Sequence, residues 1–409
     1  MSQLESATSA GVAPDYVALF VEYVLRSVQA AFTRVQQDDT PVLEEETRER
    51  ALHVLSFALR LPAAWSQTRD LLLALAPKLE QAGYRGEWLP YLTQGLALSE
   101  QLGDGLAAAE LRLHIGLLHR LQSRWEAAKE LLTSSADAFA QLGEQRGQAR
   151  ALNQLAYLAW QQHQSDEVAR LTHRALALLA EGDIERAMSL SALGLAAIEQ
   201  HRWQEAETYH RAALQIRTQH GDRRLMAWSL QNVGYALRGQ GQYEAAIACY
   251  EEAMAMLGEL NDAANRAIAQ MNLGIVYSLL GNPVKALEVY AKAESTFRTI
   301  GDELNLAKVL TCKGLDRLVL QDWKQAEEEF AFGADLFQRL GDLSEYLNAL
   351  DGLGISYLEQ GCYDQATAIF ESILVDLPEI AGTRAYPGLT KVIRGQIDRA
   401  RAEKRETLS

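Results

Sequence analysis

The sequence repeats a two-residue turn signal at an almost constant interval of 39 or 40 residues. The signal is glycine or asparagine followed by an acidic residue: Gly103-Asp104, Gly143-Glu144, Gly182-Asp183, Gly221-Asp222, Asn261-Asp262, Gly301-Asp302 and Gly341-Asp342. A series of small residues keeps the same phase, namely Gly116, Ala156, Gly194, Gly234, Gly274, Gly314 and Gly354. Twelve residues after each comes another small apolar residue: Ala128, Val168, Ala206, Ala246, Ala286, Ala326 and Ala366. Self-similarity at a fixed period of this length predicts a repeat solenoid, in which each repeat packs on its neighbours.

Each repeat is predicted to form two antiparallel helices, as its fourth copy illustrates. Residues 224–238 place apolar side chains at helical spacing, and Gly239 follows as a helix stop. A second helix is expected over 243–257, after which Asp262 is placed to cap the first helix of the next repeat. The array is therefore expected to be all-α.

The small residues and one aromatic position have a packing interpretation. Gly234 and Ala246 are expected to let the two helices of their pair approach closely. An aromatic residue also recurs three positions before the second small residue, and we expect it to pack between consecutive repeats: Trp125, Trp203, Tyr243, Trp323 and Tyr363.

The repeat resembles the tetratricopeptide repeat (TPR) family in the residues around its small positions. The matching strings are Leu193-Gly194, Val233-Gly234-Tyr235, Leu273-Gly274-Ile275-Val276-Tyr277, Leu353-Gly354-Ile355-Ser356-Tyr357 and Gly361-Cys362-Tyr363-Asp364-Gln365-Ala366. The period is longer than the 34 residues usual in the family. It is similar to arrays in bacterial signal-transduction ATPases, kinesin-light-chain-like proteins and peptide-pheromone receptors. Ala156 and Val168 in the second repeat, and Pro283 in the fifth, depart from the pattern.

The resemblance implies a right-handed superhelical solenoid of antiparallel helix pairs, with helical caps at both ends. Residues 1–64 are expected to form an N-terminal helical segment, with helices over 15–35 and 41–61, that is either a cap or a small effector bundle. Residues 65–104 are a degenerate TPR-like pair, and 381–409 a basic C-terminal capping helix and tail. The seven units between them, over 105–380, are 105–145, 146–183, 184–222, 223–262, 263–302, 303–342 and 343–380.

Composition and charge argue against several classes of protein. The net charge of −15 disfavours a nucleic-acid partner, which requires a basic face to neutralise phosphates. No run of 18 apolar residues predicts a membrane span, and residues 1–13 lack the basic and apolar parts of a secretory signal. The three cysteines lie 63 and 50 residues apart, a spacing that fits reduced thiols better than disulfides. A cytoplasmic protein with no membrane or nucleic-acid partner is expected.

The sequence contains no motif typical of an enzyme. Phosphate-binding loops, dinucleotide-binding glycine motifs, zinc-protease helices and nucleophile elbows are absent. The eight histidines are scattered, and His114 and His119 are five residues apart, a spacing that does not place them well for one metal ion. We therefore expect no catalytic residues, no metal and no cofactor.

In TPR proteins the first helix of each pair lines a concave groove, so the resemblance implies which residues face inward. In the second repeat the candidates are Arg150, Asn153, Gln154, Tyr157 and Trp160, and in the fourth and fifth they are Trp228, Gln231, Asn232, Tyr235, Arg238 and Asn272. Asn232 and Asn272 occupy equivalent positions, and a row of amides can pair with the backbone of an extended peptide. The aromatic residues offer rigid contact area, and Arg150 and Arg238 are suited to hold a carboxylate. The alternative is that some of these side chains only pack helix against helix.

Three functions are compatible with this pattern. The first is a non-catalytic scaffold or adaptor whose groove binds a peptide or an extended segment of a partner protein. The second is an intracellular sensor that changes conformation on binding a signalling peptide. The third is a regulatory partner of a signalling ATPase or a caspase-like protease. Self-association through the terminal helices is a further alternative.

Overall fold

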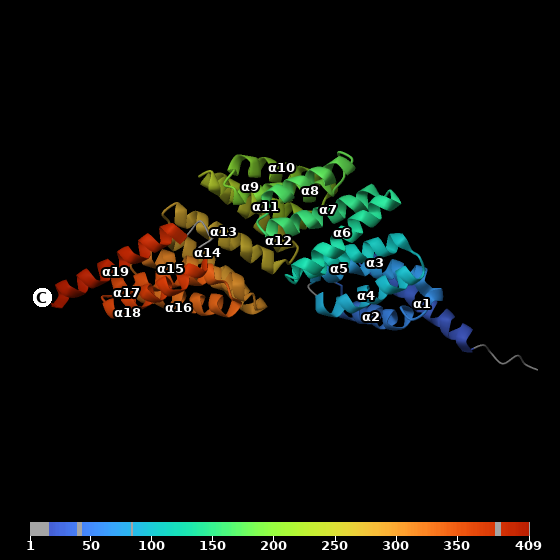
Figure 1. Ribbon diagram of the computed structural model, residues 1–409, viewed down its shortest axis with the longest axis horizontal. Helices are drawn as coiled ribbons and strands as arrows, with labels where there is room; N and C mark the ends of the chain where they lie inside the picture. Colours follow the sequence, from blue (N-terminus) through green and yellow to red (C-terminus); the bar gives the residue numbers. More distant parts are fainter. Residues whose placement is uncertain (1–15, 39–42, 83–84, 381–385, 409) are drawn as a thin grey trace, which may run out of the picture. The chain divides into compact units, whose positions relative to one another are not determined.

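The computed structural model is all-α and describes residues 16–38, 43–82, 85–380 and 386–408. Within these residues the chain forms nineteen α-helices and two short 3-10 helices, with no strand (Figure 1). The first eight helices are α1 (Tyr16–Gln37), α2 (Glu45–Ala58), α3 (Trp65–Ala82), α4 (Arg85–Gln101), α5 (Gly105–Leu121), α6 (Trp125–Leu142), α7 (Gln145–Gln161) and α8 (Ser165–Leu178), with η1 (Pro62–Ala64) after α2.

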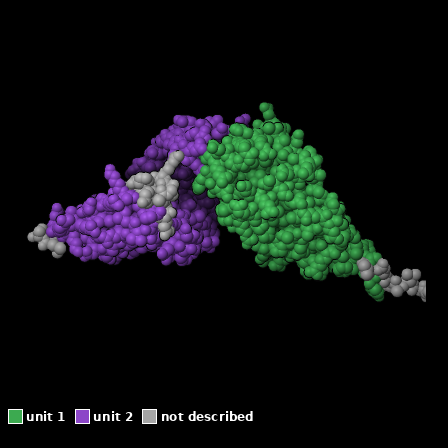
Figure 2. All heavy atoms as spheres, in the orientation of Figure 1, with its two compact units in different colours: residues 1–196 green, residues 197–409 purple. Residues whose placement is uncertain are grey.

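The remaining helices keep the same alternation of first and second helix. They are α9 (Arg186–Glu199), α10 (Trp203–His220), α11 (Arg223–Gly239), α12 (Tyr243–Glu259), α13 (Ala263–Leu279), α14 (Pro283–Ile300), α15 (Glu303–Val319), α16 (Trp323–Leu340), α17 (Leu343–Glu359), α18 (Tyr363–Asp376), η2 (Leu377–Ile380) and α19 (Tyr386–Leu408). The chain divides into two compact units, residues 1–196 and 197–409 (Figure 2).

In the first unit, the N-terminal helices pack against one another and against the helices that follow. Helix α1 contacts α2 and α3, and from α3 onward each helix contacts the next as far as α8. Val28, Leu55, Leu71 and Trp88, one from each of the first four helices, are completely buried in one apolar cluster. The helix expected over 41–61 begins at Glu45 in the structure, and residues 41 and 42 lie outside the described part of the chain.

In the second unit, the first helices of successive pairs form a continuous wall. Each helix from α10 to α18 contacts the next, and α11, α13, α15 and α17 also contact one another in turn. Within the described residues, α12, α14, α16 and α18 make no comparable contacts among themselves. In a curved array, the helices on the inner side lie closer together than those on the outer side. Because the first helices contact one another and the second helices do not, the first helices lie on the inner side. This arrangement matches the inward-facing first helix that the resemblance implied.

The recurring Gly-Asp signal is a helix stop followed by a helix cap. Gly143, Gly221, Gly301 and Gly341 adopt φ values of 70–74°, the left-handed conformation that ends a helix at little cost when the residue lacks a Cβ. The carboxylates of five aspartates then accept a hydrogen bond, at 3.0–3.2 Å, from the backbone N–H three residues later: Asp104, Asp222, Asp262, Asp302 and Asp342. The expected caps are confirmed.

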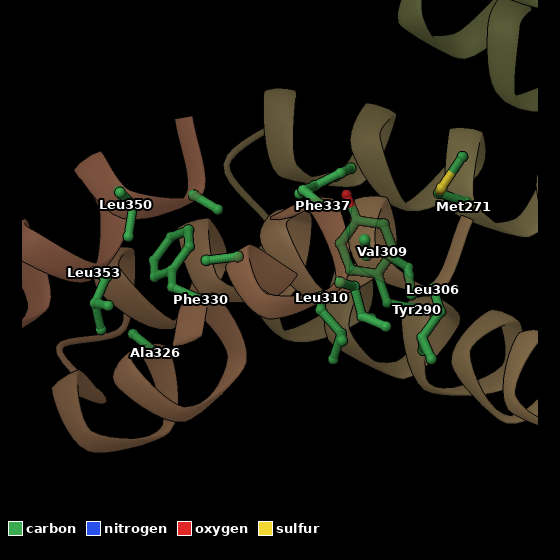
Figure 3. Packing of buried hydrophobic residues seen from close by; sticks show 14 of the residues in the cluster. Met271, Tyr290, Leu306, Val309, Leu310, Ala326, Phe330, Phe337, Leu350 and Leu353 are labelled. Carbon is green, nitrogen blue, oxygen red and sulfur yellow. The ribbon is translucent and has the colours of Figure 1, made fainter. Parts of the chain in front are cut away.

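Four glycines of the small-residue series make room for an aromatic ring that lies sixteen residues further along the chain. A Cβ on Gly274 would come within 2.4 Å of the Tyr290 ring, and one on Gly314 within 2.8 Å of the Phe330 ring. Gly234 and Gly354 stand in the same relation to Tyr250 and Phe370. Figure 3 shows Phe330 beside Ala326, Leu350 and Leu353 in the buried cluster that also contains Tyr290. The glycine therefore makes room for a ring of the second helix, which is a more specific reason than close approach of two backbones.

We predict that Gly274→Ala lowers the free energy of unfolding by about 1–3 kcal/mol, because the new methyl group overpacks a rigid buried ring. The matched control is Gly395→Ala in α19, where no described atom lies within 4 Å of the new Cβ. That change should be neutral or should stabilise by about 0.5–1 kcal/mol, since alanine favours a helix over glycine. Urea denaturation of both variants tests the prediction, which equal effects at the two positions would contradict.

The last helix closes the array through ion pairs. Arg399 of α19 lies 2.9 Å from Glu359 of α17, and Arg401 lies 2.7 Å from Glu371 of α18. Lys404 pairs with Asp364 at the start of α18. The basic C-terminal helix thus packs against α17 and α18, two acidic helices of the same chain.

Candidate binding surface of the first helices

One face of α11 carries four half-buried polar or aromatic side chains. Trp228, Asn232, Tyr235 and Arg238 follow one another at intervals of four, three and three residues, so they lie on a single stripe of the helix. The residues between them, such as Val233 and Leu237, are buried in the core. The stripe belongs to the wall of first helices described above.

The aromatic members of this stripe are held in place by neighbouring side chains. The Tyr235 ring lies 6.3 Å from the ring of Trp203 on α10, and the Arg238 guanidinium stacks on its face at 4.2 Å. The Trp228 ring lies 5.0 Å from the Arg217 guanidinium, also on α10. Such stacked contacts restrict rotamers, so these side chains present rigid contact area at low entropic cost. The contact confirms, for Trp203, the expected packing of the recurring aromatic between consecutive repeats.

The amides on the first helices differ in their accessibility. Asn232 is half-buried, and its Nδ2 donates to the carbonyl of Trp228 in its own helix at 3.0 Å. Asn272 occupies the equivalent position on α13 and is also half-buried. Gln231 is only 7% exposed. A bond within one helix turn can be exchanged for a ligand without disturbing the fold, so Asn232 and Asn272 are the two amides suited to binding.

In the first unit, the candidates Arg150 and Asn153 are already engaged by the protein. Arg150 Nη1 donates to both carboxylate oxygens of Glu110, at 2.7 and 2.9 Å. Asn153 is 1% exposed, its Nδ2 donates to the carbonyl of Glu185 at 3.0 Å, and its Oδ1 accepts from Ser189 at 2.6 Å. In this conformation neither the guanidinium nor the amide is free for a peptide, because helix-to-helix contacts use both.

The other first-unit candidates are also tied to their surroundings. Gln154 Oε1 accepts from Arg120 Nε at 3.3 Å, and the same guanidinium lies 5.6 Å from the ring of Tyr157. Tyr157 is 8% exposed and meets the half-buried Trp160 edge to face, with centroids 6.4 Å apart. Most of the binding groups predicted in this unit therefore hold the repeats together, and the candidate surface narrows to α11 and α13.

The tetratricopeptide repeat family matches residues 185–259 and 234–299. These residues are tetratricopeptide repeats. A comparison with curated proteins finds no match.

Solved structures with the same fold cover most of this chain. A Rap protein in complex with competence and sporulation factor is 16% identical, with 93% of this chain and 99% of that chain covered and a TM-score of 0.58. Aspartyl phosphate phosphatase F from Bacillus subtilis is 14% identical, with coverages of 90% and 95% and a TM-score of 0.53. A signal transduction ATPase with a TPR sensor, from Pyrococcus horikoshii, is 17% identical, with coverages of 86% and 55% and a TM-score of 0.58. At these identities the likeness concerns the TPR solenoid fold.

Burial sets the protonation state of the Cys312 thiol on α15. Burial raises the pKa of the Cys312 thiol to about 11, so it is protonated near neutral pH. No group of three or more potential metal ligands occurs within the described ranges. Nor does any described helix combine the length and apolarity needed to cross a bilayer.

Sequence reasoning missed the packing role of Tyr250 on α12, which is completely buried against α11. It belongs to the second helix, which the resemblance assigned to the outer side, yet its ring passes over Gly234 of α11. The available signal was its spacing, because Tyr250, Tyr290, Phe330 and Phe370 each follow a glycine of the second series by sixteen residues.

Proposed function

We propose that this protein is a non-catalytic interaction protein whose inner face in the second unit holds a peptide or an extended segment of a partner. The observation that carries the proposal is the pair of equivalent, half-buried amides Asn232 and Asn272 on the contacting helices α11 and α13. An amide offers one donor and one acceptor group at the same point. Two such groups one repeat apart can therefore pair with the main chain of an extended peptide, whatever its side chains.

The rigid aromatic side chains beside the amides supply the apolar part of such a site. Trp228 and Tyr235 flank Asn232 on the same stripe and are fixed by Arg217, Trp203 and Arg238. Tryptophan, tyrosine and arginine are the residue types that contribute most to binding energy in protein interfaces. The Rap protein solved in complex with competence and sporulation factor supports the proposal, because a chain of similar fold forms a complex with another molecule.

We predict that the double change Asn232→Ala with Asn272→Ala weakens partner binding by about thirtyfold. Each lost amide pairing costs about 1 kcal/mol, and the two losses add because they lie on different helices. The measurement is quantitative mass spectrometry of proteins retained from native extract by the tagged full chain and by the variant.

The matched control is Asn265→Ala with Asn305→Ala, the same chemical change at two other equivalent positions. Asn265 and Asn305 donate to the capping carboxylates of Asp262 and Asp302, at 2.8 and 2.7 Å, near the start of their helices. The control pair should retain the same partners as the unmodified chain. Equal recovery by the Asn232/Asn272 variant and the unmodified chain would refute the role of these amides.

A further inference from the structure

The first two turns of α1 carry an exposed apolar stripe. Tyr16, Leu19, Phe20 and Tyr23 are spaced three, one and three residues apart, so they lie on one side of the helix. These residues are 48–75% exposed, whereas the neighbouring Val24 is buried in the core of the first unit. A helix normally turns such a stripe towards another element.

The stripe is large for a surface patch. An aromatic side chain carries about 150–250 Å² of surface, so the exposed parts of Tyr16, Phe20 and Tyr23 amount to roughly 300–500 Å². Contiguous apolar patches of this size on soluble proteins are often functional. We therefore expect this end of α1 to bind a partner.

A groove begins where the stripe ends and continues along the same side of α1. It has a volume of about 790 Å³ and lies between α1 and α2, to which α2 contributes Val54 and Arg50. Tyr23 belongs to both the stripe and the groove. The rest of the α1 side is lined by three small residues and an arginine: Ser27, Ala30, Ala31 and Arg34. Small side chains allow close approach of a second helix, so the groove has the shape to accept one.

Stripe and groove match each other about a single point of α1, which is Leu25. When two identical helices pack antiparallel about a two-fold axis, each residue lies opposite the one at the same distance on the other side of the axis. With the axis beside Leu25, every residue of the stripe would lie opposite a groove residue of a second copy: Tyr16 opposite Arg34, Leu19 opposite Ala31, Phe20 opposite Ala30, and Tyr23 opposite Ser27. Bulky side chains would thus meet small ones, and one aromatic ring would meet a guanidinium that can stack on it.

The charges along one edge of the stripe also balance about this point. Glu22 and Arg26 are exposed and form an ion pair within α1. In the antiparallel pair, Arg26 of one copy would come within about 3 Å, along the helix axis, of Glu22 of the other. Four charges would then follow one another along this edge, with the two guanidinium groups flanked by the two carboxylates. The edge therefore has no net charge, and each cation lies beside an anion of the other copy.

We propose that two copies of this chain form a dimer through α1, antiparallel about a two-fold axis beside Leu25, with the stripe of each copy in the groove of the other. A second copy is the occupant that the structure supports, because stripe and groove occur on the same helix and complement each other in size and charge. Two stripes and two grooves together would bury roughly 1,200–2,000 Å², the size of a stable protein interface.

Sedimentation equilibrium of the full chain measures this association. Interfaces of this size have dissociation constants in the micromolar range or below, so at about 50 μM the protein should sediment at twice its mass of 45.3 kDa. A stripe variant, Leu19→Glu with Tyr23→Glu, should raise the dissociation constant more than about a hundredfold. A groove variant, Ala30→Trp, fills the space that the stripe would occupy and should have the same effect.

The matched control is Val375→Glu with Val392→Glu, the same kind of change at exposed apolar residues of α18 and α19. This variant should remain a dimer with an unchanged dissociation constant. Because all the substituted residues are exposed, each variant should keep its fold, which circular dichroism checks.

A pair of charge variants tests the antiparallel register. Glu22→Arg leaves four cations along the edge and Arg26→Glu leaves four anions, so each variant alone should associate about tenfold more weakly than the unmodified chain. Mixed in equal amounts, the two variants would alternate in charge along the edge. The mixture should therefore form a heterodimer at least as tight as the unmodified dimer.

Three results would overturn the proposal. If the unmodified chain is a monomer at about 50 μM, the stripe binds a different partner. If a dimer persists in both the stripe variant and the groove variant, the two copies meet at another surface. If the two charge variants do not recover association when mixed, the α1 helices do not pack in this register.

Discussion

Replacing His210 with phenylalanine is expected to raise the free energy of unfolding and to remove much of its dependence on pH between about 4 and 6.5. His210 on α10 is completely buried, and neither ring nitrogen has a hydrogen-bond partner in the described ranges. Burial, followed by the nearby Arg217 cation, lowers the pKa of His210 to about 3. The folded protein therefore keeps this imidazole neutral.

The direction of the pH effect follows from which state binds the proton. Unfolding exposes His210 and returns its pKa to about 6.5. Below that pH the unfolded chain therefore binds a proton that the folded chain does not bind. Stability is then lost as the pH falls from about 6.5 towards 3. One pKa unit corresponds to about 1.4 kcal/mol, so the loss at pH 5 is about 2 kcal/mol.

Phenylalanine fits this position because His210 belongs to the same series as Tyr250, Tyr290, Phe330 and Phe370. The matched control is His173→Phe, a change at an exposed histidine on α8 that should leave the pH dependence intact. Urea unfolding at pH 7.5 and pH 5 measures both variants. If His210→Phe loses as much stability between the two pH values as the unmodified protein does, the explanation is wrong.

Lys313→Leu is expected to lower the free energy of unfolding by about 3–5 kcal/mol, the usual cost of removing one partner from a buried ion pair. Lys313 on α15 has a side chain only 12% exposed, and its Nζ lies 2.8 Å from Glu294 Oε2 and 2.6 Å from Glu329 Oε1. Burial alone would lower the pKa of Lys313, but hydrogen bonds to the two carboxylates hold it above its usual value. Leucine would leave two partly desolvated carboxylates without their shared cation.

Placing apolar residues at positions 294, 313 and 329 together should reverse this loss of stability. Other repeats of the second unit have apolar residues at all three of these positions. The position of Lys313 is taken by Val233, Leu273 and Leu353, and that of Glu329 by Cys249, Val289 and Ile369. The position of Glu294 is taken by Met254, Ala334 and Leu374. The triple change Lys313→Leu, Glu294→Met and Glu329→Val is therefore predicted to be neutral or to stabilise by about 1–4 kcal/mol, as apolar replacement of buried ions often does. Denaturant unfolding compares the single and triple variants. A triple variant as unstable as the single one would contradict the account.

The helices were predictable from the sequence because their signals are local. The expected helices over 224–238 and 243–257 are observed as Arg223–Gly239 and Tyr243–Glu259, since apolar spacing and glycine stops lie within each segment. The aspartate caps were predictable for the same reason.

The sequence did not predict which inward-facing polar side chains are bonded to another helix, because these bonds depend on residues far away in the chain. From their positions in the repeat, Arg150 and Asn232 were both predicted to face the groove and to bind a peptide. The structure separates them: Glu110 of α5 holds the guanidinium of Arg150, whereas Asn232 bonds only within its own helix turn. The packing of Tyr250 was hidden in the same way, since its buried ring fills the space that Gly234 of α11 leaves open.

Site-specific photo-cross-linking in the native cell tests the binding surface most directly. p-Benzoylphenylalanine in place of Ile275, half-buried on α13 between the positions of Asn272 and Ser278, would sit on the proposed face. The control position is Val375 on α18, which is 75% exposed on a second helix. The account predicts a covalent adduct with a partner chain from position 275 that Asn232→Ala with Asn272→Ala removes. Adducts from position 375 with none from 275 would contradict it.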